Sequence, residues 1–234
     1  MRNVVWPNGY ETKPNKSTWM ISVTPSGQGC GVTVIGFDLA SKLDPSTVGA
    51  IHNAWLTHHV LVFQNQDLDD TAFEIFAESI CPIGADPFFA PIDGKKRIAA
   101  ISQRADEVGP LFAEVWHSDW NFLETPPAGT CLYSITIPPS GSDTLFFNEQ
   151  KALKEMPTSL RTRLQAKTAL HSARRAFAPD GNYALDKYKG SMDIGPSEEA
   201  LAVFSHPLIR KHPETGRPGL FVGSYVFAFE ETSV

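Results

Sequence analysis

The chain has 234 residues and a formal net charge of -6, with 42% hydrophobic and 20% charged residues. This composition supports a sizeable core and excludes wholesale disorder. The acidic balance, without a basic stripe, argues against a nucleic-acid-binding surface, and no apolar run reaches the length of a membrane span. Cys30, Cys81 and Cys131 have no CxxC spacing, so the sequence predicts neither a zinc knuckle nor a disulfide framework, but reduced thiols in a cytoplasmic protein.

The first part of the chain predicts a strand pair, a helix, a strand and a second helix. Residues 23–36 indicate strands interrupted by the turn sequence PSGQGCG. Asp44 as a cap and Pro45 in the first turn predict a helix over STVGAIHNAWLTHH. The run VLVFQNQ indicates a short buried strand. A second, amphipathic helix is expected over LDDTAFEIFAESI, where one face carries Leu68, Phe73, Phe76 and Ile80.

Beyond Gly84 the pattern changes to short strands separated by turns rich in Pro, Gly and Ser. Strands are expected in KRIAAISQR, EVWHSDWNF, GTCLYSITIP and DTLFFN, the texture of a sandwich or jelly roll. A helical interval broken at Met156-Pro157 comes next, then a loop-rich insertion over residues 177–199 and a strand-like final segment. Helices packed on a strand-rich body predict a single mainly-β or α+β domain over residues 1–234.

The stretch Trp116–Phe122, WHSDWNF, places His117 and Asp119 two residues apart among residues that favour strands. Alternate residues of a strand share one face, so both side chains could reach one metal ion. Non-heme Fe(II) oxygenases hold iron with a facial triad of two histidines and one carboxylate, and leave the other coordination positions open. The alternative is that the two side chains bond only each other or solvent. Trp116 and Trp120 are expected to point away from the ligands, into packing.

Three blocks of the chain resemble one family. The segment WHSDWNFLETPPAGTCLYSITIPPSGSDTLFFN is similar to the core signature of the TauD/TfdA family of Fe(II)- and 2-oxoglutarate-dependent dioxygenases, W-H-[ST]-D followed by P-P and G-x-D-T. Residues 29–68 and the later segment HPLIRKHPETGRPGLFV resemble two further blocks of that family, in the same order. The resemblance implies a double-stranded β-helix (jelly roll) with flanking helices, and an enzyme that uses Fe(II), 2-oxoglutarate and O₂. Such an enzyme decarboxylates 2-oxoglutarate to succinate and hydroxylates a small organic substrate.

The resemblance also implies roles for three residues of the metal and co-substrate sites. His117 and Asp119 match the first two iron ligands. Thr144 matches the threonine that helps to hold 2-oxoglutarate, and a hydroxyl there can donate to an anionic oxygen. The alternative for Thr144 is an ordinary strand threonine.

Three further residues match positions that bind substrate in the taurine-specific member of the family. Asp86 and Phe89 stand where that member has a histidine and a tyrosine, and Ala113 stands where it has an asparagine. An aspartate would repel a sulfonate, so we expect a substrate other than taurine, such as an amine or a hydroxylated compound. The alternative for Asp86 is a loop cap before Pro87. The aromatic run of Phe88, Phe89 and Phe112 could line an apolar pocket or fill the core.

The chain departs from the family pattern after the HPETG segment, where the third iron ligand, a histidine, and the arginine that pairs with 2-oxoglutarate are expected. No histidine follows His212, and the only later arginine is Arg217. We therefore expect a C-terminally truncated enzyme that lacks its closing strands, with low activity. The alternative is a jelly-roll pseudoenzyme that binds a small molecule or a subunit. His171, His206 and His212 are expected to be structural.

The same reasoning predicts the partners of the protein. They are a small-molecule substrate and further copies of the chain in a homo-oligomer, with no nucleic acid and no membrane.

Overall fold

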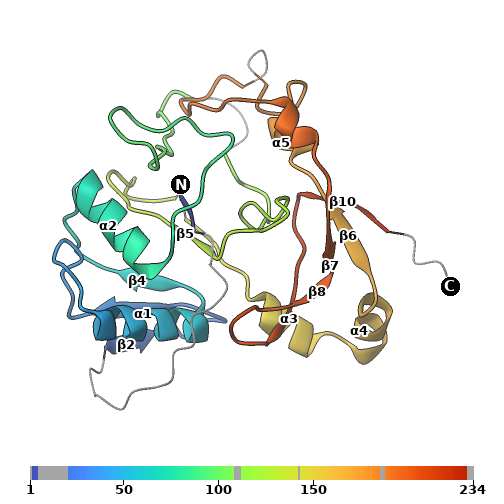
Figure 1. Ribbon diagram of the computed structural model, residues 1–234, viewed down its shortest axis with the longest axis horizontal. Helices are drawn as coiled ribbons and strands as arrows, with labels where there is room; N and C mark the ends of the chain where they lie inside the picture. Colours follow the sequence, from blue (N-terminus) through green and yellow to red (C-terminus); the bar gives the residue numbers. More distant parts are fainter. Residues whose placement is uncertain (1, 5–20, 108–111, 142, 185–187, 231–234) are drawn as a thin grey trace.

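Four small β-sheets with helices beside them form this computed structural model, which describes residues 2–4, 21–107, 112–141, 143–184 and 188–230 (Figure 1). One three-stranded sheet has the order β2-β3-β4, from Ser22–Pro25, Val32–Ile35 and Leu61–Phe63. β2 and β3 are antiparallel, whereas β3 and β4 are parallel. The crossover between the parallel strands is α1, Pro45–His58.

Local sequence signals start and stop the two helices of this first part. The Asp44 side chain accepts hydrogen bonds from the backbone N–H groups of Ser46 and Thr47, and a proline opens α1. The helix ends at His59, whose φ of 68° places it in the left-handed region and whose N–H donates to the Trp55 carbonyl. α2, Asp70–Ile80, is capped by Asp69. Both predicted helices are confirmed.

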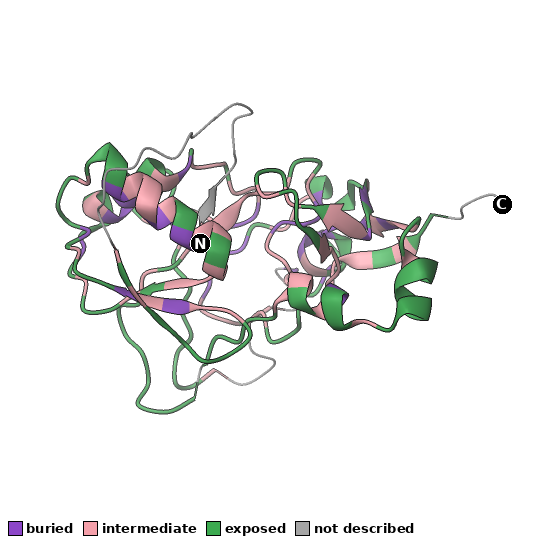
Figure 2. Ribbon diagram, turned by 90° about the horizontal axis from the view of Figure 1, so that it is seen from below, coloured by how far each residue is buried: buried purple, intermediate pink, exposed green. Residues whose placement is uncertain are grey.

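The face predicted for α2 packs inward. Leu68, Phe73 and Phe76 are each 8% exposed or less. They form a core cluster with Leu39 from the loop before α1, Ile51 from α1 and Ile98 from the loop after α2. Burial of one such side chain contributes about 1.5–3 kcal/mol. This cluster is one of two described in the chain, and buried positions are spread over both halves of the molecule (Figure 2).

The later part of the chain is built on a second three-stranded sheet, of order β10-β6-β7. Its strands are antiparallel: β6 is Thr168–His171, β7 is Phe204–Pro207 and β10 is Val226–Phe229. β8 and β9, Ile209–Lys211 and Pro218–Leu220, form a separate hairpin. The HPETG turn of this hairpin has Gly216 at φ 65°, as expected for a tight turn.

The remaining elements are short. The predicted helical interval is confirmed as α3, Glu149–Glu155, and α4, Thr158–Leu164, which are separated at the expected break. α5 covers Arg174–Phe177 and the 3₁₀-helix η1 covers Glu198–Leu201. β1, Arg2–Val4, pairs antiparallel with β5, Gly129–Cys131. Within the described residues, no helix combines the length and apolar content needed to cross a lipid bilayer.

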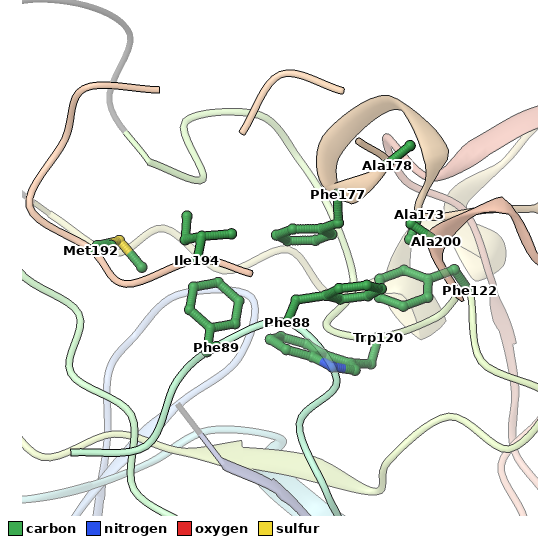
Figure 3. Close-up of a cluster of buried hydrophobic side chains, with 10 residues drawn as sticks. All are labelled: Phe88, Phe89, Trp120, Phe122, Ala173, Phe177, Ala178, Met192, Ile194 and Ala200. Carbon is green, nitrogen blue, oxygen red and sulfur yellow. The ribbon is translucent and has the colours of Figure 1, made fainter. Parts of the chain in front are cut away.

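A second, aromatic core lies between α5 and the loops that precede β5 (Figure 3). The rings of Phe88 and Phe177 are stacked, with centroids 4.6 Å apart and an interplanar angle of 5°. Trp120 and Phe122 pack against the same group, with ring centroids 6.2 Å apart. Offset and edge contacts of this kind add about 0.5–1.5 kcal/mol per pair to the effect of burial.

Several of the strands expected beyond Gly84 are absent. Residues 96–104, 114–122 and 143–148, all of them described, contain no strand, and GTCLYSITIP forms one only over β5. Trp120 has φ 50° and Ala113 has φ 58°, conformations that interrupt an extended chain. A strand also needs a neighbouring strand for its backbone hydrogen bonds. Short strand-like runs between turns therefore over-predicted the number of strands.

Candidate metal centre

The chain brings His117 and Asp119 together at one point. Nε2 of His117 lies 3.1 Å from Oδ1 of Asp119, and the two side chains are 21% and 24% exposed. The shared strand expected for them is wrong, because residues 116–118 are irregular and a turn begins at Asp119. The convergence arises from this turn, in which the N–H of Asn121 donates to the Ser118 carbonyl. We call residues 115–122 the ligand loop.

Two neighbours orient the pair. Nδ1 of His117 donates to the Val115 carbonyl at 2.8 Å, which leaves Nε2 on the side of Asp119. The hydroxyl of Thr130, on β5, donates to Oδ2 of Asp119, so that Oδ1 is left for another partner. The hydrogen bond with Asp119 raises the pKa of His117 above its ordinary value, against the opposing effect of burial. Outer partners of this kind fix the ring and carboxylate of metal ligands.

The two tryptophans of the ligand loop differ. Trp120 is 3% exposed and packs in the aromatic core, as predicted. Trp116 is 59% exposed, and its ring lies 6.0 Å from that of Phe147, which is 60% exposed. The expectation that Trp116 points into packing is therefore wrong. The left-handed conformation at Trp120 turns the chain at that residue, so alternation does not govern where these side chains point.

The segment before β10 covers the ligand loop. The N–H of Ser224 donates to the Trp116 carbonyl at 3.0 Å. The ring of Tyr225 packs edge-on against His117, with centroids 6.2 Å apart and an interplanar angle of 90°. Burial, and then the charge of Asp119, raise the pKa of Tyr225. Sequence reasoning missed Thr130 and the residues 223–225, because nothing in the local pattern links them to residues 117–119.

The donor set fits a divalent metal in part. An imidazole nitrogen and a carboxylate oxygen 3.1 Å apart can both bind one ion, and both are held by further hydrogen bonds. Among the described residues, no group of three or more His, Cys, Asp or Glu side chains could hold a metal ion. His117 and Asp119 therefore supply two ligands, and the other positions are left to groups outside this set.

The three histidines expected to be structural, His206, His212 and His171, lie at separate places in the fold. Nε2 of His206 donates to the Leu123 carbonyl at 2.9 Å. Nδ1 of His212 accepts from the backbone N–H groups of Glu214 and Thr215 and so closes the HPETG turn. His171 lies on β6, as expected, and is 0% exposed. None of the three is brought to His117 in the described part of the chain.

Asp86 acts as a loop cap. Its Oδ1 accepts from the backbone N–H groups of Phe88 and Phe89, at 2.9 and 3.0 Å. Its Oδ2 is buried without a hydrogen-bond partner in the described part of the chain. Burial raises the pKa of Asp86, opposed by those two hydrogen bonds, and the negative charge of Asp119 raises it further. Asp86 thus caps the loop at Phe88 and Phe89, one of its two expected roles, and the charge of Asp119 acts on it as well.

The other predicted substrate residues lie in or beside the aromatic core. Phe89 is 5% exposed and contacts the rings of Phe112, Trp120 and Phe177, at 5.6–5.8 Å between centroids. Core filling is thus the role the structure shows for Phe89. Ala113, in a left-handed turn, is partly buried.

Thr144, the residue expected to help hold 2-oxoglutarate, lies in an exposed loop. It makes no hydrogen bond within the described residues, so its hydroxyl remains available to a ligand.

Comparisons with known proteins identify the family of the chain. Residues 22–233 match the family described as "Taurine catabolism dioxygenase TauD, TfdA family". The chain is 31% identical over 214 residues to an alpha-ketoglutarate-dependent sulfate ester dioxygenase of Pseudomonas putida, covering 88% of this chain and 67% of that protein. It is 29% identical over 216 residues to an (S)-phenoxypropionate/alpha-ketoglutarate-dioxygenase of Delftia acidovorans, covering 89% of this chain and 73% of that protein.

A solved structure supports the same fold. The crystal structure of a taurine dioxygenase from Burkholderia xenovorans superposes with a TM-score of 0.66 at 26% identity, covering 91% of this chain and 68% of that one. This likeness confirms the expected TauD-like, jelly-roll fold class. The chain spans only 60% of an alkylsulfatase of Acinetobacter baylyi, to which it is 31% identical over 197 residues, 83% of this chain. Because the family match covers residues 22–233, the chain belongs to the TauD/TfdA family of dioxygenases, which use Fe(II), 2-oxoglutarate and O₂.

Proposed function

We propose that this protein oxidises a small organic substrate other than taurine, with 2-oxoglutarate as co-substrate and Fe(II) held by His117 and Asp119. The observation that carries the proposal is the convergence of these two side chains, 3.1 Å apart, with the outer hydrogen bonds from Thr130 and to Val115. The family match favours this enzyme over the alternative of a binding module without catalysis.

The residues of this chain would prepare the metal position in two ways. The Val115 carbonyl keeps the proton on Nδ1 of His117, so Nε2 can lose its proton and bind metal. Thr130 holds Oδ2 of Asp119 and thereby aims Oδ1 at the same point. Bound Fe(II) supplies the oxidation chemistry, which couples O₂ reduction to decarboxylation of 2-oxoglutarate and hydroxylation of a C–H bond. Thr144 is proposed to donate its hydroxyl to the 2-oxoglutarate carboxylate.

The substrate side of the proposal rests on Asp86. Its carboxylate is largely buried and lies near Asp119, so a sulfonate beside it would meet two negative charges. Taurine is therefore disfavoured at this position, and an amine or a hydroxyl is favoured. Ala113 and Phe89 would contribute shape rather than polar contacts to the substrate site.

The test is succinate release with Fe(II), ascorbate and 2-oxoglutarate, together with Fe(II) binding measured directly. Wild-type protein is expected to consume 2-oxoglutarate only when Fe(II) is present. His117→Ala and Asp119→Ala should each abolish this and weaken metal binding, whereas His58→Ala, at the end of α1, should change neither. Unchanged turnover and unchanged metal binding in Asp119→Ala would refute the ligand assignment.

The protein is further proposed to form a homo-oligomer and to be located in the cytoplasm. Several large apolar side chains stand in solvent, Ile135 at 87% and Leu145 at 70% exposed among them, which supports a homo-oligomer. Light scattering after size exclusion would give the number of subunits, and a monomer at micromolar concentration would contradict this part. The three cysteines are free thiols, which supports the proposed cytoplasmic location.

A further inference from the structure

A pocket of about 590 Å³ lies where α5, the chain after η1 and the start of β10 meet. Pockets that hold small molecules span roughly 300–1,000 Å³, so its size suits a small ligand. We call it the arginine pocket. The residues that line it and carry the argument are Arg174, Arg175, Asn182, Tyr225 and Phe227.

The charge of the arginine pocket is positive. Asp180, also in its lining, lies 4.0 Å from Nη2 of Arg174 and offsets one of the two guanidinium groups. Arg175 has no ion pair within the described residues, and only its backbone carbonyl is engaged, by the N–H of Asn182. A guanidinium presents a planar fork of donors that fits a carboxylate or a sulfate. A ligand with one anionic group would therefore balance the remaining positive charge of the pocket.

Part of the lining of the arginine pocket is apolar. Leu201, Val203 and Phe227 are 38%, 49% and 45% exposed, which is high for large apolar side chains. They stand within the same pocket as the two arginines, so a ligand with one anionic end and one apolar body would cover both. An inorganic anion would satisfy only the charged half.

The arginine pocket is next to the ligand loop but distinct from it. Tyr225 lines the pocket and also packs edge-on against the ring of His117. Ser224, another lining residue, donates its N–H to the Trp116 carbonyl. Residues 224 and 225 therefore contact both the arginine pocket and the ligand loop.

We propose that the arginine pocket is a binding site for a small organic anion, a carboxylate or a sulfate ester with an apolar body, held by Arg175 and Arg174. The anion lies at the two guanidinium groups and the apolar body lies along Phe227. Binding at this site does not depend on the proposed reaction, since it can be measured without iron or 2-oxoglutarate.

The test is calorimetric binding with four matched probes: hexyl sulfate, hexanoate, hexanol and hexylammonium. The two anions are expected to bind, and Arg175→Ala should weaken them by about 10-fold or more, because a charge-assisted pair is lost. The matched control is Arg161→Ala, an exposed arginine on α4, which should leave binding unchanged. Preference between the two anions identifies which acid group the site takes.

Two further results decide the proposal. Phe227→Ala should weaken hexyl sulfate but not inorganic sulfate, because only the former reaches the apolar lining. Arg175 is exposed, so its replacement should leave the unfolding temperature unchanged, and this is measured alongside. Equal binding of hexanol and hexyl sulfate, or equal losses in Arg175→Ala and Arg161→Ala, would overturn the site.

Discussion

A Cβ atom placed on Gly223 would stand 3.1 Å from the Cα atom of His117 and 3.2 Å from the backbone nitrogen of Ser118. The chain before β10 therefore passes directly against the ligand loop, at a distance that suits glycine. Nδ2 of the fully buried Asn121 lies 3.5 Å from the same position. The backbone around His117 and Asp119 thus packs against a segment that follows about 100 residues later in the sequence.

Gly223→Ala should disturb the metal centre without touching a ligand. The added methyl group meets backbone, which cannot rotate away, so the ligand loop must shift by a few tenths of an ångström. We expect weaker Fe(II) binding and a loss of about 1–3 kcal/mol in unfolding free energy. The control is Gly49→Ala in α1, where an added Cβ would meet nothing within 4 Å beyond its chain neighbours and the backbone of its own helix. That change should stabilise the helix by up to about 1 kcal/mol and leave Fe(II) binding as it was.

Thr130→Val should weaken Fe(II) binding although Thr130 is not a ligand. The substitution keeps the shape of the side chain and removes the donor to Oδ2 of Asp119. Loss of an outer-shell partner costs roughly 10- to 100-fold in metal affinity. Thr130→Ser keeps the hydroxyl and should retain most of the affinity. Equal affinities in the valine and serine variants would show that the hydrogen bond has no part in metal binding.

Thr144→Ala should raise the 2-oxoglutarate concentration needed for half-maximal succinate release. A hydrogen bond to a charged group contributes about 1.5–3 kcal/mol, so the expected increase is roughly 10-fold or more. The maximal rate should change little, because the group binds the co-acid rather than the reacting carbon. Thr144→Ser is the control that keeps the hydroxyl. A fall in maximal rate with no change in 2-oxoglutarate requirement would contradict this role.

His171 should make the protein acid-sensitive. It is 0% exposed, and neither ring nitrogen has a hydrogen-bond partner in the described part of the chain. Burial, and then His206 and Arg210, which both face it, lower the pKa of His171 to about 4. In the unfolded chain His171 has an ordinary pKa of about 6.5. Between pH 6.5 and pH 4 the unfolded chain therefore binds a proton that the folded protein does not. The free energy of unfolding falls as the pH falls through this range, by roughly 3 kcal/mol in all.

Urea unfolding between pH 7.5 and 4.5 measures this effect. His171→Phe should flatten the pH dependence, since the ring that cannot take a proton still packs against Phe221, 5.3 Å away between centroids. Some slope should remain, because burial also lowers the pKa of His206. His58→Gln should leave the slope of the wild-type protein. The idea is falsified if His171→Phe and wild type lose stability in parallel.

Added imidazole should increase Fe(II)-dependent succinate release by the 234-residue chain. Within the described residues no third His, Cys, Asp or Glu is placed to hold the same ion as His117 and Asp119, so free imidazole can supply a missing nitrogen ligand. We expect low turnover without it and a saturable increase at millimolar imidazole. Asp119→Ala should show no such increase. Robust turnover without imidazole would mean that another residue or a second subunit already completes the site.

Much of the secondary structure could be read directly from short stretches. The Asp44-Pro45 start of α1, the break at Met156 and the HPETG turn are local signals, and each is found where expected. The inward face of α2 follows from helical spacing alone. These features depend on residues within one or two turns of each other, which is the range over which propensity and capping act.

Several expected strands do not form, because strand formation depends on a partner strand that the local sequence does not specify. DTLFFN is rich in residues that favour strands, yet Leu145, Phe146 and Phe147 are 57–70% exposed and no strand forms there. Such composition indicates a capacity to form a strand, whereas pairing needs a second strand in register. The ligand loop shows the same limit, since the conformation of Trp120 overrides its strand-like composition.

His117 and Asp119 could be singled out as candidate metal ligands from their spacing in the sequence, and from a resemblance to a family whose match is confirmed. The tertiary structure alone decided how they are held. The hydroxyl of Thr130, the close approach of Gly223 and the ring of Tyr225 reach the pair across intervals of 11 to about 100 residues. Such contacts depend on how β5 and the segment before β10 pack around the ligand loop, and packing between distant segments leaves no local signature in the chain.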